Sequence, residues 1–211
     1  MNAEQKLAKY VFAVTIIFMA AAFAYIPQFH EIEQHPITGI LVGALTGTGL
    51  FEALAKLVEL SFTKIKRIKR FILASSYVEG QWVGFYKSPS GQVRLIREFI
   101  RQDWSSISIN GQAFDSSKMP YGQWRSYSAI VEGDAGLLRA TIVGDLNSGH
   151  YDSVVEYQLE GDPPNRRSGR IVDIVSNVNA GSAWMRLKKI DDDESEVRAL
   201  DEAANFYNEF I

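Results

Sequence analysis

From Tyr77 to Ile190 polar and apolar residues alternate, and this period of two is the feature that most limits what the chain can fold into. Because successive side chains of a strand point to opposite faces, the alternation predicts half-buried β-strands. Turn signals such as SPSG, NGQ, DLNSG and GDPPNRRSG separate the strands. Eight strands can be read, at residues 81–87, 93–101, 104–110, 123–131, 136–144, 150–159, 169–176 and 182–189.

Eight short strands without helices between them predict an antiparallel meander. Closing the meander into a barrel would remove its exposed strand edges. An eight-stranded barrel encloses either packed side chains or one small ligand. In the run 150–159 we expect one face to point inward, made of Tyr151, Ser153, Val155, Tyr157 and Leu159, opposite Asp152, Glu156 and Gln158.

The barrel region contains nine arginines but four lysines, and it is rich in aromatic residues. The planar guanidinium suits phosphate groups, and aromatic rings suit stacking on nucleobases, so the composition favours a nucleotide ligand. The candidate ligand-binding residues are Tyr86, Arg97, Trp124, Tyr127, Arg139, Tyr151, Tyr157 and Arg186. The alternative for each is that the aromatic side chains fill the core and the arginines cover the outside of a small barrel.

Two long uncharged runs precede residue 60, from Tyr10 to Phe29 and from Pro36 to Phe51. The first has 20 residues, about the length that a helix needs to cross the hydrocarbon core of a bilayer. The second would have to continue beyond Phe51 to reach that length. Because the connection between the runs is short, we expect an antiparallel hairpin of two transmembrane helices.

Small residues recur along both predicted helices. Gly39, Gly43 and Gly47 occupy every fourth position of the second run, and Ala20 and Ala24 form a similar strip on the first. In lipid, small residues let two helix backbones approach closely. These five residues are candidates for helix–helix packing, either within one hairpin or between the subunits of a homo-oligomer.

Basic residues flank the two runs on one side only. Lys6 and Lys9 precede the first run, TKIKRIKR follows the second, and the connection between the runs has no basic residue. This bias predicts a multi-pass protein of a bacterial inner membrane, in contact with the lipid bilayer, with both termini and the barrel cytoplasmic. A signal peptide cleaved after AFA at 22–24 is the alternative.

The C-terminal segment predicts a helix at 191–211. An acidic run suited to a helix N-terminus opens it, and Val197, Leu200, Ala204, Tyr207 and Ile211 then recur at helical spacing. We expect this helix to pack on the barrel. The expected fold class is a membrane α-helical hairpin plus an all-β domain: residues 1–73 form the hairpin with a basic juxtamembrane helix, 74–190 the barrel, and 191–211 the amphipathic helix.

No pattern typical of catalysis is present. The chain has no cysteine and three histidines, which excludes thiolate chemistry and a three-histidine zinc centre in one place. There is no P-loop and no HExxH motif. We therefore expect no enzyme, no catalytic residue, no metal site and no cofactor. The net charge of −3 gives no indication of a DNA or RNA polymer as partner.

The stretch EGQWVGFY, Glu79 to Tyr86, places Trp82 and Gly84 on the first strand of the barrel, after the two apolar runs and a basic segment. In this layout the chain resembles the two-transmembrane β-barrel effectors of bacterial CBASS antiphage systems, although lipocalin-like barrels also begin with a glycine–x–tryptophan pattern. The resemblance implies that the barrel receives a cyclic dinucleotide made by a CD-NTase after infection. Binding would then promote oligomerisation, disruption of the inner membrane and cell death.

Three other functions stay open. A membrane-tethered, lipocalin-like barrel could bind a lipid or another apolar ligand. A solid barrel without a ligand could act as an adaptor that recruits proteins. A holin-like protein could form pores without any small-molecule trigger.

Overall fold

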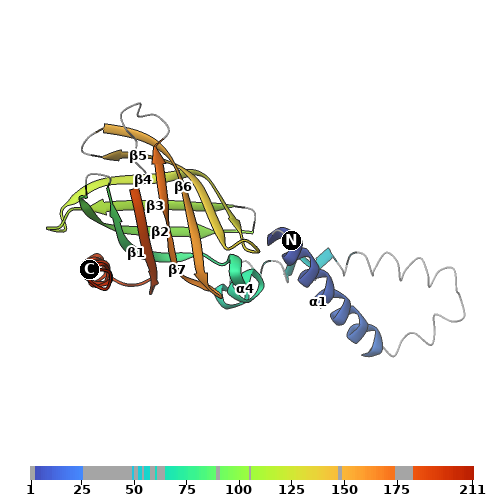
Figure 1. Ribbon diagram of the computed structural model, residues 1–211. Coiled ribbons are helices and arrows are strands. Elements are labelled where there is room, and N and C mark those ends of the chain that lie inside the picture. Colours follow the sequence, from blue (N-terminus) through green and yellow to red (C-terminus); the bar gives the residue numbers. More distant parts are fainter. Residues whose placement is uncertain are drawn as a thin grey trace, which may run out of the picture. The chain divides into compact units, whose positions relative to one another are not determined.

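The computed structural model describes residues 3–25, 49, 52–53, 55–57, 60, 65–88, 91–104, 106–146, 149–173 and 183–211. The chain divides into two compact units, Met1–Leu73 and Ala74–Ile211, and each is considered by itself (Figure 1). The second unit contains the β-strands and the C-terminal helix.

Eight antiparallel strands form a closed barrel in the second unit, in which each strand pairs with the next and β8 pairs with β1. The predicted eight-stranded meander barrel is therefore confirmed. The strands are β1 Gly80–Lys87, β2 Val93–Gln102, β3 Ile107–Phe114, β4 Pro120–Glu132, β5 Leu137–Leu146, β6 Gly149–Gly161, β7 Pro164–Asp173 and β8 Ala183–Ile190.

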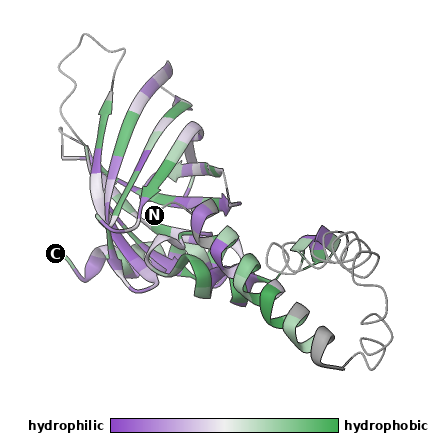
Figure 2. Ribbon diagram, turned by 90° about the vertical axis from the view of Figure 1, so that its right-hand side faces the viewer, coloured by the Kyte–Doolittle hydropathy of each residue, from purple (hydrophilic) through white to green (hydrophobic). Residues whose placement is uncertain are grey.

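Hydrophobic and hydrophilic residues alternate along the strands, as Figure 2 shows by colour. In β6 the inward face was predicted correctly: Ser153, Val155, Tyr157 and Leu159 are buried, and Tyr151 packs against the same core. Their neighbours Val154, Glu156 and Gln158 are exposed or half-buried. The alternation in sequence thus corresponds to the inside and outside of the barrel.

One predicted turn is wrong, because NGQ at 110–112 lies inside β3. The turn predicted in GDPPNRRSG is present but shorter, since only Asp162 and Pro163 separate β6 from β7. At Gly111 the glycine serves packing rather than a turn. A Cβ there would lie 2.1 Å from Cε2 of Trp124, so the backbone of β3 lies directly against the indole ring. From Pro164 onward, β7 pairs with β6.

The C-terminal helix α5, Glu196–Asn208, packs on the outside of the barrel as predicted. Its buried stripe joins the outward-facing Val83, Leu95 and Phe114 in a second hydrophobic cluster. The predicted face is only partly correct, since the buried residues are Ala199, Leu200, Ala203 and Phe206, whereas Val197 and Ile211 are exposed. Ser195 caps the N-terminus of the helix, because its side chain accepts a hydrogen bond from the Arg198 N–H.

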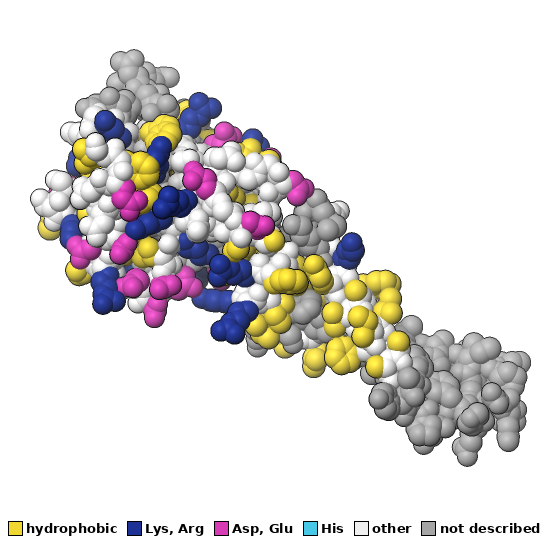
Figure 3. All heavy atoms as spheres, turned by 60° about the horizontal axis from the view of Figure 1, so that its bottom comes forward, with side chains coloured by type: hydrophobic (Ala, Val, Ile, Leu, Met, Phe, Trp, Pro, Cys, Tyr) yellow, Lys and Arg dark blue, Asp and Glu magenta, His cyan; other side chains and the backbone are white. Residues whose placement is uncertain are grey.

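Ion pairs add to this apolar contact. Arg97 contacts Glu196 at 3.2 Å, Lys188 contacts Glu202 at 2.7 Å, and Lys118 pairs with Asp201. Basic and acidic side chains are also interspersed over the face of the barrel in Figure 3. In each pair the carboxylate is exposed, so the pairs contribute little to stability and the helix depends mainly on its buried stripe.

In the first unit, helix α1 spans Ala3–Tyr25 and helix α4 spans Lys66–Leu73. The two helices contact each other, and the ring of Tyr10 lies edge-on to that of Phe71 with 6.4 Å between the centroids. Leu7 and Thr15 are the buried side chains among those described in α1. This unit therefore contains a helix pair, formed by α1 with the basic α4.

The predicted transmembrane hairpin is wrong. Among the described residues, no helix combines the length and the hydropathy that a membrane span needs. The uncharged part of α1 begins at Tyr10 and the helix ends at Tyr25, so this part rises about 24 Å at 1.5 Å per residue. A bilayer core is about 30 Å thick. The predicted position as a multi-pass protein of a bacterial inner membrane is wrong for the same reason.

The residues predicted to pack the hairpin are mostly outside the described part of the chain. Gly39, Gly43 and Gly47 lie there, as does the second predicted span, 36–51, apart from Gly49. Ala20 and Ala24 lie in α1, where the side chain of Ala20 is exposed.

The packing of Trp124 on β3 gives the first testable prediction. We expect Gly111→Ala to lower the free energy of unfolding by about 1–3 kcal/mol, because the new methyl group has no room against the indole. Chemical denaturation measures this difference. Ser108→Ala, at an exposed position of the same strand, is the control and should change stability by less than about 0.5 kcal/mol. A Gly111→Ala protein as stable as the control would contradict the described packing.

Candidate functional site

A buried ion pair crosses the interior of the barrel. Glu98 on β2 and Arg167 on β7 are each 1 % exposed, and Arg167 Nη2 donates a hydrogen bond to Glu98 Oε2. The two strands are not neighbours in the sheet, so the pair spans the inside of the barrel. Because removing a charge from water costs several kcal/mol, each of these groups needs the other.

Three aromatic side chains surround the pair. Trp124 Nε1 and the Tyr157 hydroxyl both donate to Glu98 Oε1, at 3.1 and 3.2 Å. The guanidinium of Arg167 lies over the ring of Tyr157, 4.3 Å from its centroid, and over that of Trp82 at 4.7 Å. These cation–π contacts stabilise a charge whose hydration shell has been removed. We call Trp82, Glu98, Trp124, Tyr157 and Arg167 the Glu98 cluster.

One end of the barrel, next to the Glu98 cluster, is closed by packed side chains. Trp82 Nε1 donates to the carbonyl oxygen of Val78 at 2.8 Å, and Val78 itself is fully buried. The carboxamide of Gln102 accepts from the Val78 N–H and donates to the Ser76 carbonyl. These bonds hold the short 3-10 helix η1, Ala74–Ser76, and the residues after it against the barrel, and we call this the Val78 end.

The opposite end has a different lining, and we call it the Tyr86 end. Strand pairing and burial direct Tyr86 and Arg94 inward, and Tyr86, Tyr121 and Tyr151 pack against the core while remaining half-buried. The guanidinium of Arg94 lies 4.2 Å from the centroid of the Tyr121 ring. Three tyrosines and one arginine thus line the end that the packed η1 segment does not close.

Burial changes the acidity of two tyrosines. Desolvation raises the pKa of the Tyr86 phenol, and the neighbouring Tyr121 adds to the rise while Arg94 opposes it. Desolvation also raises the pKa of Tyr157 well above its ordinary value. The nearby Glu98 carboxylate raises this pKa further, as the second cause. Both phenols are therefore neutral near pH 7 and can donate a hydrogen bond.

Three buried polar atoms inside the barrel have no hydrogen-bond partner among the described residues: Arg167 Nε, Arg167 Nη1 and Ser153 Oγ. Buried polar atoms are nearly always paired in native proteins, with protein groups or with ordered water. Ser153 lies two residues from Tyr151 on the inward face of β6. These three atoms are covered by the surrounding side chains, so they belong to the packed interior and not to a surface that a ligand can reach directly.

The structure divides the eight candidate ligand-binding residues into two groups. Tyr86, Trp124, Tyr151 and Tyr157 point into the barrel, Trp124 and Tyr157 as members of the Glu98 cluster. The other four are on the outside: Arg97 pairs with Glu196, Arg139 pairs with Glu132 and Glu156, Arg186 lies over Phe210 and Trp184, and Tyr127 is 68 % exposed.

Sequence reasoning missed four interior residues, Arg94, Glu98, Tyr121 and Arg167. In β2 both faces are partly apolar, because α5 covers the outward Leu95 while Ile96 points into the core. The alternation therefore does not reveal on which face Arg94 and Glu98 lie. Arg167 was placed in a turn, and its true position follows from the pairing of β7 with β6.

No protein-family model matches this chain, and no curated protein sequence matches it. Solved structures of designed barrels are similar in fold. A redesigned β-barrel has a TM-score of 0.43 and 13 % identity over 56 % of this chain and 96 % of its own. The redesigned barrel mFAP1, bound to DFHBI, has a TM-score of 0.42 and 13 % identity over 55 % and 98 %. Similarity this low says nothing about what the chain binds.

Among the described residues, no group of three or more histidine and acidic side chains is placed to hold a metal ion. The described part of the interior offers guanidinium, phenol, indole and hydroxyl groups instead.

The Glu98 cluster gives a second prediction. Arg167→Met leaves a buried carboxylate without its cation, and we expect a loss of about 3–5 kcal/mol in the free energy of unfolding. Adding Glu98→Gln removes the charge but keeps an acceptor for Trp124 and Tyr157, so the double variant should regain about 1–3 kcal/mol. Denaturant titrations measure both values. A double variant no more stable than Arg167→Met would contradict the role given to the ion pair.

A third prediction concerns pH. Because the pKa of Tyr157 is raised on folding, the folded protein keeps this proton at pH values where the unfolded chain releases it. Above about pH 10, the free energy of unfolding should therefore fall by about 1.4 kcal/mol per pH unit on account of this residue.

Urea titrations between about pH 9 and 11 test the effect. Tyr157→Phe should show a shallower alkaline decline than the wild type, and Tyr127→Phe, at an exposed position, should keep the wild-type slope. Parallel curves for the wild type and Tyr157→Phe would contradict the raised pKa.

Proposed function

We propose that the barrel is a receiver for a small ligand that carries aromatic rings and phosphate groups. A cyclic dinucleotide is the member of this class that the resemblance to CBASS β-barrel effectors implies. The ligand would occupy the Tyr86 end, above the Glu98 cluster. This location combines two of the predicted residues, Tyr86 and Tyr151, with two that the sequence did not indicate, Arg94 and Tyr121.

The observation that carries the proposal is the position of Arg94. Its guanidinium faces inward at the half-buried end of the barrel and stacks on Tyr121. Its Nη2 donates to the carboxamide of Gln92 at 3.0 Å, and it forms no ion pair with a carboxylate among the described residues. Because a carboxamide and an aromatic ring do not neutralise the guanidinium, its positive charge can attract an anionic ligand. Its planar set of N–H donors fits phosphate oxygens.

The tyrosines suit the rest of such a ligand. Tyr86, Tyr121 and Tyr151 are half-buried, so each presents part of its ring to whatever enters this end. Stacking of a nucleobase on an aromatic side chain contributes about 1–3 kcal/mol and tolerates any base. The pair of functions, ring stacking and phosphate binding, is what a cyclic dinucleotide requires.

A purely apolar ligand such as a lipid is less favoured by the same residues. It would cover the half-buried Arg94 guanidinium without replacing the hydrogen bonds that this group makes in water. The interior therefore supports the nucleotide proposal over the apolar carrier.

Calorimetric titration of the full chain tests the proposal, with 3′,3′-linked cyclic dinucleotides of the four common bases as probes. We expect at least one of them to bind, and Arg94→Gln should weaken that binding by about tenfold or more. Arg139→Gln is the matched control, because Arg139 lies outside the barrel, paired with Glu132 and Glu156. Its affinity should equal that of the wild type.

Two results would contradict the proposal: no binding by any probe, or equal weakening by the Arg94 and Arg139 variants. Light scattering during the same titration tests the ligand-driven homo-oligomer that the resemblance implies. A rise in mass that follows ligand saturation is expected. A constant mass would contradict ligand-driven association, whereas ligand binding itself is tested by the calorimetry.

A further inference from the structure

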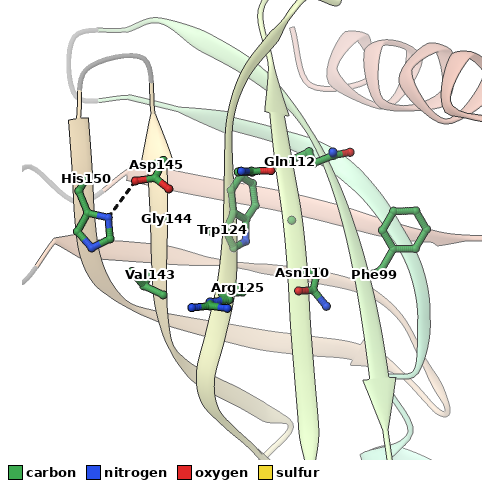
Figure 4. A pocket seen from close by; sticks show the side chains of 11 residues that line it. Phe99, Asn110, Gln112, Trp124, Arg125, Val143, Gly144, Asp145 and His150 are labelled. Atoms are coloured by element: carbon green, nitrogen blue, oxygen red, sulfur yellow. Dashed lines mark hydrogen bonds and ion pairs between the residues drawn. The ribbon is translucent and has the colours of Figure 1, made fainter.

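A groove of about 450 Å³ crosses the outer wall of the barrel from β2 to β6. Figure 4 shows its side chains on neighbouring strands. Glycine residues form part of its lining, since Gly111 and Gly144 have no side chain and Trp124 between them directs its indole to the Glu98 cluster. The floor is therefore mostly backbone, and the groove lies on the opposite side of the wall from the Tyr86 end.

Two rows of outward side chains form the walls. Asn110 is paired across the strands with Arg125, and Arg125 with Val143. The second row lies two residues further along the strands, where Gln112 is paired with Gln123, and Gln123 with Asp145. Because alternate residues on one face of a strand are about 7 Å apart, the two rows can contact a ligand one ring wide from both sides.

The hydrogen-bonding side chains of these walls can bind a ligand. Asn110, Gln112, Gln123 and Arg125 are exposed, and none makes a side-chain hydrogen bond or ion pair with another described residue. Each carboxamide offers donors and an acceptor side by side. At the end of the groove, Asp145 Oδ1 lies 3.0 Å from His150 Nδ1, within hydrogen-bond distance.

The charge of the walls argues against an anionic ligand. Arg125 and Asp145 carry opposite charges on the same stretch of the groove, and the three carboxamides are neutral. A phosphate-bearing ligand would meet Asp145 as well as Arg125. The described lining therefore favours a neutral molecule with many hydroxyl groups over a nucleotide or a nucleic acid strand.

One aromatic ring completes the site. Phe99, 37 % exposed, lies at one end of the first row, paired with Asn110, while Val143 at the other end is 6 % exposed and offers little surface. A sugar ring has hydroxyl groups at its edge and C–H groups on its faces, so it could use the carboxamides and the phenyl ring together. We propose that this groove is a binding site for a neutral saccharide, independent of the receiver site inside the barrel.

Isothermal titration of the full chain with maltotriose tests the proposal, with adenosine and inorganic phosphate as comparison probes. We expect saturable binding of the trisaccharide, and neither comparison probe should displace it. The double variant Asn110→Ala/Gln123→Ala should weaken it by about tenfold or more. Gln158→Ala, an exposed carboxamide elsewhere on the barrel, should bind as the wild type does.

Absence of trisaccharide binding, or binding that the double variant leaves unchanged, would overturn the proposal. Displacement of the bound trisaccharide by adenosine or phosphate would overturn it too, because the groove would then serve a ring system or an anion. Circular dichroism of the double variant should match the wild type, since both positions are exposed. Arg94→Gln should retain trisaccharide binding, so failure of the receiver proposal and failure of this one can be told apart.

Discussion

The interaction on which the barrel depends is the buried pair of Glu98 and Arg167. The two residues are 69 positions apart in sequence, and they lie on strands that do not pair in the sheet. Either charge alone inside the barrel would cost several kcal/mol, so the pair is compatible only with a closed barrel in the observed register. Trp124 and Tyr157 donate hydrogen bonds to the same carboxylate, and the guanidinium lies over the rings of Trp82 and Tyr157. The five side chains therefore hold one another in place.

This cluster also separates the interior into two parts with different chemistry. On one side, the hydrogen bonds of Trp82 and Gln102 with the residues around Val78 close the barrel. On the other side, Tyr86, Arg94, Tyr121 and Tyr151 are inward-facing or packed on the core, yet only half-buried. A closed end and a polar floor are what a small barrel needs to receive a ligand from one direction, and the proposed receiver site follows from this asymmetry.

Sequence alone predicted the barrel well, because the period-two pattern depends on short-range geometry and was clear in β6. Prediction from sequence failed where one sequence pattern has more than one structural explanation. An uncharged run predicted a membrane span, but α1 ends at Tyr25. Gly111 suggested a turn, but it provides room for Trp124. Of the candidate site, the inward aromatic residues were predictable, whereas Arg94 and Glu98 were not, since β2 is covered by α5 on one side and by the core on the other. The positions of Gly111, Arg94 and Glu98 are decided by packing between separate elements, which leaves no local signal in the sequence.

The receiver proposal requires that the ligand with aromatic rings and phosphate groups binds inside the barrel and not on its outer wall. Nitrogen-15 NMR of arginine side chains in the full chain tests this most directly, by following each Nε–H during a titration with the cyclic dinucleotides. Saturable changes are expected at Arg94, with none at the exterior Arg139. Changes confined to Arg125 and Arg139, or no change at Arg94 at saturating ligand, would contradict it.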